Sequence, residues 1–384
     1  MKFEFATATR IVFGAGTMPQ FGANVKPYGR HALVVTGRNP QRAEQWLASL
    51  AASGIGSAIF PVAGEPEIST VENGVALAKR ENCDFVIGFG GGSVIDAGKA
   101  IAAMLANAGE LLDYLEIIGR GQTLARRAAP FIAVPTTAGT GAEVTRNAVL
   151  ASPAHQVKVS LRSPHLLPRL AVVDPELTYD LPPALTATTG LDALTQLIEP
   201  YVCLRANPMT DGFCVDGLLR AARSLRKAVF DGQNQSARED MALASLFGGL
   251  ALANTGLGAV HGFAGPIGGS FPAPHGAVCA ALLPHVMAAN LRALREREPE
   301  SFALRRYCRV ATLLTGNPSA TADAGVEWVQ KLVADLPVPK LGVFGLREEH
   351  VAELVGKAKS ASSMKANPVQ LTDNELAQTL RLAL

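Results

Sequence analysis

Two histidines and one aspartate are the residues best suited to chemistry in this chain. His261 and His275 lie in a stretch from Met241 to Leu291 that contains no Lys, Arg, Asp or Glu. An ionisable side chain in such apolar surroundings needs a polar partner. Upstream, Asp192 and Gln196 are four residues apart in a helix-like segment, so they share one helix face. An aspartate with two distant histidines fits a divalent metal site, although each histidine alone could be a hydrogen-bonded core residue.

A glycine-rich turn is the second candidate site. Gly90, Gly91, Gly92 and Ser93 follow a strand-like run and open a helix-like one. Backbone N–H groups at such a helix start form an anion site suited to a pyrophosphate, and Asp96 follows on the same helix. The motif is neither G-x-G-x-x-G nor a Walker loop, and a tight turn without a ligand would use the same residues.

Hydroxyl side chains follow the next strand-like run. Thr136, Thr137 and Thr140 come directly after it, at the edge where doubly wound sheets bind nucleotides. Thr140 and Glu143 also have the spacing of a capping box, so they could begin a helix, and both roles are compatible. We add Lys158 to the candidate cofactor-binding residues.

The elements that position these residues divide the chain into two halves. Apolar runs predict strands at 31–37, 57–62, 84–89 and 131–135, and helical patterns between them cover 41–52, 71–81 and 94–107. This alternation implies a parallel sheet with helices on both faces, and residues 3–13 are expected as a strand outside it. Helical patterns then cover 186–204, 208–230, 236–254 and 300–315. We therefore expect an α/β domain at 1–178 and an all-α domain at 179–384.

Composition excludes several classes of protein. With 48% hydrophobic and 18% charged residues among 384, the chain is not disordered. A net charge of +2 leaves no excess of basic residues for binding nucleic acid. Pro, Asn and Gly residues interrupt the charge-free stretch, which favours buried helices over a membrane span. Five cysteines without a C-x-x-C pair indicate reduced thiols rather than disulfides or a cysteine zinc site. The N-terminus lacks a signal pattern, so we expect a cytoplasmic protein.

Ordered sequence blocks resemble the iron-containing (group III) alcohol dehydrogenase family, within the dehydroquinate synthase-like superfamily. The resemblance runs nearly end to end. It implies an N-terminal Rossmann-like domain, a helical C-terminal domain, and a metal with NAD(P) in the cleft between them. The blocks are Phe13-Gly-Ala-Gly16, Gly90-Gly-Gly-Ser-Val-Ile-Asp-Ala-Gly-Lys99, Pro135-Thr-Thr-Ala-Gly-Thr140, Gly190-Leu-Asp-Ala-Leu-Thr195, Gly256-Leu-Gly-Ala-Val-His261, Pro274-His-Gly-Ala277 and Leu282-Leu-Pro-His285.

Two positions depart from the family pattern. The family usually has a histidine where this chain has Gln196, and often a second one where it has Gly265. The resemblance therefore implies Asp192, His261 and His275 as metal ligands, with Gln196 as a weaker neutral candidate. Related glycerol dehydrogenases use an aspartate and two histidines with zinc. Both Fe(II) and Zn(II) are therefore open, as is a site without metal.

The expected activity is reversible oxidation of a small alcohol to an aldehyde or ketone, with hydride passing to NAD(P). The metal would act through Asp192, His261 and His275 as a Lewis acid. A dehydroquinate-synthase-like lyase is disfavoured by the charge-free surroundings of the histidines. A glycerol-dehydrogenase-like enzyme or a catalytically weakened nucleotide-binding protein remain alternatives. We expect a homodimer and no nucleic-acid or membrane partner.

The choice of nicotinamide cofactor depends on the end of the first predicted parallel strand. No acidic residue occurs between Thr36 and Arg42, where an Asp or Glu would bind the ribose 2′-OH of NAD. Gly37 leaves room there, and Arg38 or Arg42 could pair with a 2′-phosphate, unless both are simply solvated. The sequence therefore favours NADP(H) or dual use.

Overall fold

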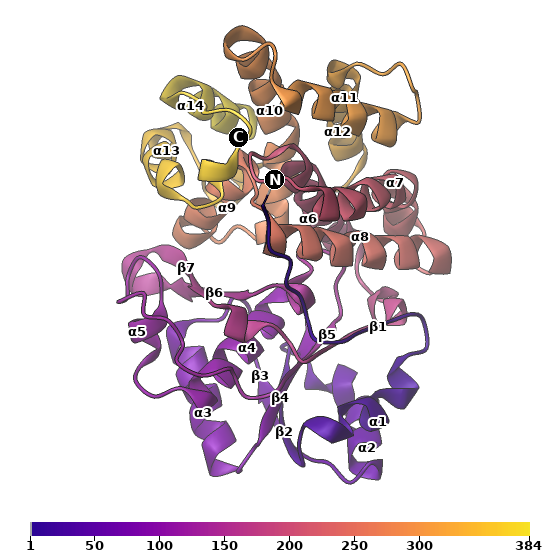
Figure 1. The fold of residues 1–384 in the computed structure, drawn as a ribbon, viewed down its shortest axis with the longest axis vertical. Coiled ribbons are helices and arrows are strands. Elements are labelled where there is room, and N and C mark those ends of the chain that lie inside the picture. The colour runs from indigo at the N-terminus through magenta and orange to yellow at the C-terminus, as the bar shows by residue number, and fades with distance from the viewer. Residues whose placement is uncertain (1) are drawn as a thin grey trace. The chain divides into compact units, whose positions relative to one another are not determined.

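The computed structural model describes residues 2–384 (Figure 1). They form two compact units. The α/β unit comprises residues 6–137 and 141–178, and the helical unit comprises residues 2–5, 138–140 and 179–384. Each unit has its own buried apolar core.

A six-stranded, all-parallel sheet forms the centre of the α/β unit. Its strand order is β1-β8-β5-β4-β2-β3. The strands are β1 (Ile11–Phe13), β2 (His31–Thr36), β3 (Gly56–Pro61), β4 (Phe85–Gly90), β5 (Phe131–Pro135) and β8 (Leu170–Val173). The central strands are buried on both faces, which explains their continuous apolar sequences.

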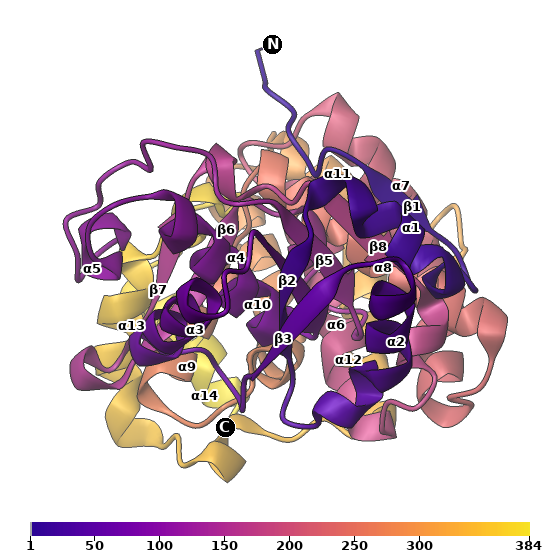
Figure 2. The ribbon, with the colours of Figure 1, turned by 90° about the horizontal axis from the view of Figure 1, so that it is seen from below.

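Helices cover both faces of this sheet. Helices α1 (Phe21–Val25) and α2 (Glu44–Ala52) pack on one face, and α3 (Ile68–Arg80) and α4 (Gly92–Ala106) on the other (Figure 2). Helix α4 approaches β5 so closely that a Cβ added at Gly98 would lie 2.6 Å from the Phe131 ring. The predicted α/β fold with a parallel sheet is confirmed.

The strand order creates a switch point between β2 and β4. The chain leaves β2 toward β3 on one side, then crosses to β4 on the other side. Thr36 lies beside Phe89, and Gly90 lies beside Pro135. The residues that follow β2, β4 and β5 therefore gather at one sheet edge, where open α/β sheets bind nucleotides.

Two features of this unit differ from the prediction. Of residues 3–13, only Ile11–Phe13 form a strand, and that strand belongs to the main sheet through pairing with β8. Residues 2–5 instead belong to the helical unit, where the Phe5 ring stacks on Phe213 at 5.9 Å. An antiparallel hairpin of β6 (Asn147–Ser152) and β7 (Val157–Arg162), not assigned from the sequence, is also present.

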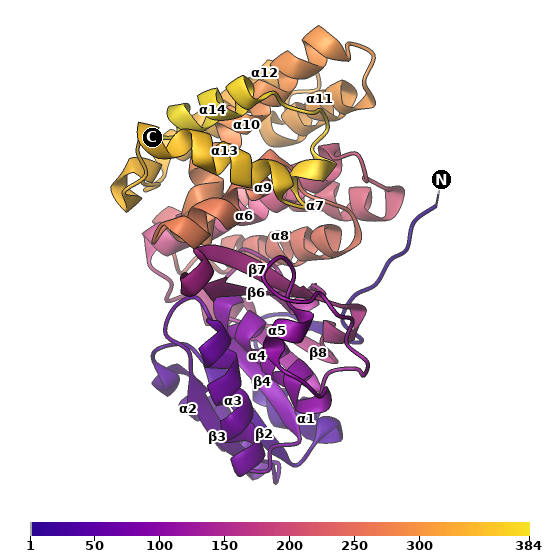
Figure 3. The same cartoon turned by 90° about the vertical axis from the view of Figure 1, so that its left-hand side faces the viewer.

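The helical unit is built from nine α-helices among the described residues, as expected for the second half of the chain. They are α6 (Pro183–Val202), α7 (Pro208–Phe230), α8 (Gln235–Asn254), α9 (Ala259–Ser270), α10 (His275–Arg297), α11 (Phe302–Thr315), α12 (Ala322–Asp335), α13 (Val351–Ser360) and α14 (Asp373–Leu382). Helix α9 runs beside α13, and α11 beside α12 (Figure 3).

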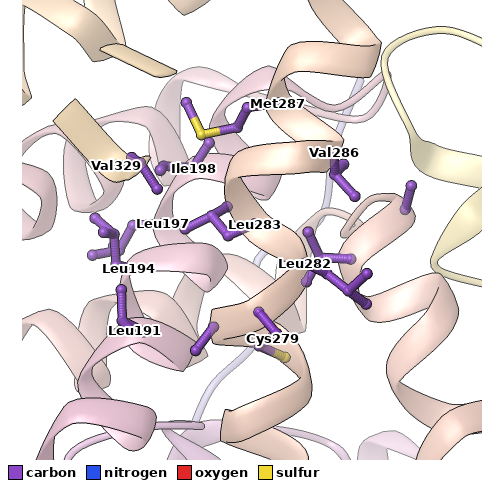
Figure 4. Close-up of a cluster of buried hydrophobic side chains, with 14 of the residues drawn as sticks. Leu191, Leu194, Leu197, Ile198, Cys279, Leu282, Leu283, Val286, Met287 and Val329 are labelled. Carbon is purple, nitrogen blue, oxygen red and sulfur yellow. The ribbon is translucent and has the colours of Figure 1, made fainter. Parts of the chain in front are cut away.

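Helix α10 is central to this unit. Its apolar side chains, including Leu282, Leu283 and Val286, share one buried cluster with Leu194 and Leu197 of α6 (Figure 4). By length and hydropathy, α10 could cross a membrane. However, 83% of its most apolar 18-residue window is buried inside the protein, which is typical of a core helix.

Candidate metal centre and cofactor-binding turn

Four side chains of the helical unit converge on one point. Asp192, His261, His275 and Cys279 each offer one ligand atom, and these atoms all lie within 4.8 Å of one another. The structure thus brings together the three ligands suggested by the sequence and adds a cysteine. Carboxylate oxygen, imidazole nitrogen and thiolate sulfur are the donor types that bind zinc and iron in proteins.

Helix α6 supplies the carboxylate of this cluster. Asp192 Oδ2 accepts a hydrogen bond of 3.0 Å from Thr140 Oγ1, which fixes the carboxylate plane. Its other oxygen, Oδ1, has no hydrogen-bond partner and lies 3.4 Å from His261 Nε2 and 3.5 Å from His275 Nε2. Thr140 therefore orients a candidate ligand. The capping-box interpretation of Thr140 is wrong, because Gly141 is the N-cap of the short turn at Ala142–Val144.

The first turn of α9 carries His261. Its Nδ1 lies 2.6 Å from Glu199 Oε2, while Glu199 Oε1 accepts a 2.8 Å hydrogen bond from the Val260 N–H. Because an ionised carboxylate only accepts, Nδ1 carries a proton. Nε2 faces the cluster, and it offers a lone pair to a metal when the imidazole is neutral. Such a carboxylate behind a histidine is the usual support of a metal-binding imidazole. Glu199 had no assigned role in the sequence analysis.

Helix α10 begins with His275 and presents Cys279 one turn later. Cys279 Sγ lies 3.7 Å from His275 Nε2 and 3.8 Å from His261 Nε2. Sequence analysis excluded a cysteine zinc site because no C-x-x-C pair occurs, yet Cys279 lies inside this cluster. The available signal was the His275-x-x-x-Cys279 spacing, which places both side chains on one helix face.

Electrostatics in the cluster favour a positive charge. Burial alone would lower the pKa of His275, but its interactions with Cys279 and Asp192 raise it to about 10. The pKa of His261 is also raised well above its ordinary value, against the effect of burial. Burial would raise the pKa of Asp192, but both imidazoles hold it well below its usual range. Such a site suits a bound cation.

Gln196 lies one turn after Asp192 on α6 and is fully buried. Its Nε2 donates a long hydrogen bond of 3.4 Å to the Gly139 carbonyl, whereas its Oε1 has no partner. A buried amide oxygen without a donor is costly unless something electropositive faces it. Together with the unpartnered Asp192 Oδ1, this orphaned acceptor fits a divalent metal at the cluster.

In the α/β unit, the glycine-rich turn joins β4 to α4 at the switch point. Gly91 is the extended N-cap and Gly92 the first helical residue, so the first N–H groups of α4 are free of intrahelical partners. The Thr136 N–H bonds the Gly90 carbonyl at 3.0 Å, which ties the threonine loop to this turn. A Cβ added at Gly91 would lie 3.4 Å from the Thr137 side chain. Gly90–Ser93, Thr136 and Thr137 therefore border the edge expected to bind a nucleotide.

Two other candidate cofactor residues are engaged in packing. Asp96 Oδ2 accepts a 3.1 Å hydrogen bond from the Val149 N–H, which joins α4 to β6. Lys158 Nζ pairs with Glu65 at 3.1 Å, and its side chain is only 5% exposed. These contacts give both residues a structural role, and their contact with a cofactor stays a prediction.

Gly37 and Arg38 directly follow β2 at the same sheet edge. A Cβ added at Gly37 would meet nothing within 4 Å, and Arg38 is exposed. Arg42 donates a 3.4 Å hydrogen bond to the Leu177 carbonyl. The position where an acidic residue would bind a ribose is therefore open at Gly37, and the exposed Arg38 guanidinium follows it.

Both halves of the chain match one protein family. The profile described as "Iron-containing alcohol dehydrogenase" matches residues 8–175. The profile described as "Fe-containing alcohol dehydrogenase family, C-terminal" matches residues 186–384. The chain belongs to the iron-containing alcohol dehydrogenase family. The resemblance seen in the sequence is confirmed. Members of this family use NAD(P) and iron, and the chain is an NAD(P)-linked oxidoreductase that acts on CH–OH groups.

Individual relatives cover nearly the whole chain. Long-chain-alcohol dehydrogenase 1 of Geobacillus thermodenitrificans is 36% identical, over 96% of this chain and 95% of the relative. The 1,3-propanediol dehydrogenase of Klebsiella pneumoniae is also 36% identical, over 99% and 98%. The crystal structure of a 1,3-propanediol oxidoreductase superposes with a TM-score of 0.92 at 34% identity, covering both chains completely.

Proposed function

We propose that this chain is a metal-dependent dehydrogenase of small primary or secondary alcohols, with Asp192, His261 and His275 as metal ligands. The observation that carries the proposal is the convergence of these three donors, with Asp192 Oδ1 unpartnered between two imidazole Nε2 atoms at 3.4 and 3.5 Å. Gln196 Oε1, also unpartnered, is the neutral candidate for a further ligand.

Each residue has a distinct task in this proposal. A bound divalent metal supplies a Lewis acid that stabilises negative charge on the substrate oxygen. Thr140 fixes the carboxylate of Asp192, and Glu199 fixes the tautomer and ring plane of His261. The nicotinamide accepts the hydride, and the chain's part is to hold its pyrophosphate at Gly90–Ser93.

No protein general base is assigned, because Gly265 stands where the family often has a histidine. A Cβ added at Gly265 would meet nothing within 4 Å, so the position is open. Solvent or a ribose hydroxyl of the cofactor serves this step in our proposal. Fe(II) is the family's metal, and Zn(II) fits the same three donors.

The first experiment measures metal content and NAD(P)H formation with a panel of alcohols, for the wild type and His261→Ala. We expect one divalent ion per chain in the wild type, and loss of both metal and activity in the variant. The proposal is wrong if His261→Ala retains metal, or if the metal-loaded wild type oxidises no alcohol and reduces no aldehyde.

For the cofactor, we propose use of NADP(H), alone or alongside NAD(H). The open space at Gly37 and the exposed Arg38 support this choice. In Gly37→Asp, a new carboxylate would repel a 2′-phosphate, so kcat/KM should shift toward NAD. A wild type that strongly prefers NAD, or a ratio unmoved by Gly37→Asp, would contradict it.

We also propose a cytoplasmic homodimer. All five cysteines are free thiols, which suits a reducing compartment. Phe3, Leu204 and Met209 are large apolar side chains of the helical unit that are 51%, 70% and 48% exposed. Such side chains are candidates for a contact between copies. Light scattering gives the mass in solution, and a monomer would contradict the proposal.

A further inference from the structure

Cys279 has surroundings unlike those of the other buried cysteines of the helical unit. Its Sγ lies 3.7 and 3.8 Å from the Nε2 atoms of His275 and His261, and the residue is 0% exposed. The Cys203 thiol instead donates a hydrogen bond of 3.3 Å to the Pro200 carbonyl. Cys214 is also 0% exposed, and burial raises its pKa well above the ordinary value.

The placement of Cys279 follows from helix geometry. His275 and Cys279 are one turn apart on α10, so their side chains leave the same face of the helix. Asp192 and Gln196 have the same relation on α6. Two helices thus each present a pair of polar groups. On α6, the second group is a neutral amide where the family usually has an imidazole.

We infer that Cys279 is a ligand of the metal and compensates for the missing imidazole at Gln196. The inference rests on the proposed function, which places a metal at Asp192, His261 and His275. On coordination, the Cys279 S–H bond breaks, its proton passes to solvent, and the sulfur electron pair forms a bond to the ion. The four-residue cluster then offers one oxygen, two nitrogens and one sulfur.

A thiolate in this set changes the expected metal. Sulfur is a soft donor, and mixed sulfur, nitrogen and oxygen ligation at four positions is typical of zinc. Zinc also expands to five ligands, which leaves room for a substrate oxygen. The chain should therefore bind Zn(II) more tightly than Fe(II).

The experiment uses the whole protein with Co(II) and with Zn(II), prepared under a phosphine reductant. Thiolate ligation gives Co(II) a near-ultraviolet charge-transfer band, and zinc-edge X-ray absorption detects a sulfur neighbour at about 2.3 Å. Both readouts are independent of activity. We expect both signals in the wild type, so the test does not depend on any variant folding.

Cys279→Ala and Cys214→Ala form the matched pair of variants, since each removes one fully buried thiol from the helical unit. Cys279→Ala should lose both sulfur signals and bind zinc at least about 10-fold more weakly, because even loss of a group that merely orients a ligand costs about 10–100-fold. Cys214→Ala should keep the signals and the affinity.

The outcomes separate this inference from the proposed function. A wild type that binds one metal with oxygen and nitrogen neighbours only would overturn the role of Cys279 and leave the three-ligand site standing. Sulfur signals that survive in Cys279→Ala would do the same. A wild type that binds neither Co(II) nor Zn(II) would overturn both proposals.

Discussion

Replacing Glu199 by glutamine tests whether the carboxylate behind His261 controls metal binding. Glu199 is 4% exposed, and its two oxygens serve two different donors, the Val260 N–H at 2.8 Å and His261 Nδ1 at 2.6 Å. A glutamine has only one acceptor oxygen. In Glu199→Gln, either one donor loses its partner, or His261 changes tautomer and places its proton on Nε2.

Both consequences weaken the site, but by different routes. An orphaned buried donor costs about 1–3 kcal/mol of folding stability. The alternative tautomer removes the Nε2 lone pair from the cluster, and loss of such orienting carboxylates typically costs about 10–100-fold in metal affinity. We therefore expect zinc affinity to fall by about 1.4–2.7 kcal/mol in Glu199→Gln.

The assay is competition with a chromophoric chelator, together with thermal unfolding of the metal-free protein. Asp240→Asn is the control, because Asp240 is a buried carboxylate of the same unit that accepts hydrogen bonds from Arg223 and Ser224. The control should lose stability and keep its zinc affinity. If Glu199→Gln behaves like the control, Glu199 only caps the start of α9 and the reasoning is refuted.

Three further predictions concern the two units separately. Gln196→His should raise Fe(II) affinity, because imidazole binds iron better than an amide oxygen; affinity and activity that both stay unchanged would place Gln196 away from the metal. Gly91→Ala should fold, since its Cβ would only touch Thr137. The added methyl group should hinder close approach of the backbone to the pyrophosphate and raise the Kd for NAD(P) by about 10-fold. An unchanged Kd in calorimetry would contradict contact with the pyrophosphate. Burial raises the pKa of Glu143 to about 7, so the folded state keeps a proton that the unfolded state releases above about pH 4.5. The free energy of unfolding should therefore fall by about 3 kcal/mol as the pH rises from about 4.5 to about 7. Urea unfolding at several pH values should show this fall in the wild type but not in Glu143→Gln. The same pH dependence in both proteins would contradict the prediction.

Most of the fold could be predicted from the sequence because strands and helices leave local patterns of apolar and glycine residues. Continuous apolar runs such as Phe85–Gly90 predict strands buried on both faces, and the glycine turn that follows marks a strand-to-helix junction. The hairpin at 147–162 was missed, although its first strand alternates between buried and less buried positions. The strand at Ile11–Phe13 is only three residues long, too short to be distinguished from the extended segment before it.

The candidate metal site could be predicted only in part from the sequence, because its supporting contacts join distant parts of the chain. Thr140 reaches Asp192 across 52 positions, and Glu199 reaches His261 across 62. No local pattern distinguishes Thr140 from a helix-starting threonine, and the capping-box prediction failed for that reason. Cys279 has no second cysteine at metal-ligand spacing, so only its spacing from His275 indicates a place in the cluster.

Helix α6 nevertheless carries a signal that apolar periodicity hides. Asp192, Gln196 and Glu199 are separated by four and three residues, so they form a polar stripe along one face of a largely apolar helix. All three are at most 4% exposed, and burying such a stripe is costly unless each group has a partner. Helical spacing of polar residues within an apolar segment therefore predicts a site as directly as apolar spacing predicts a core. Applied to α10, the same rule pairs His275 with Cys279 on one face of the helix.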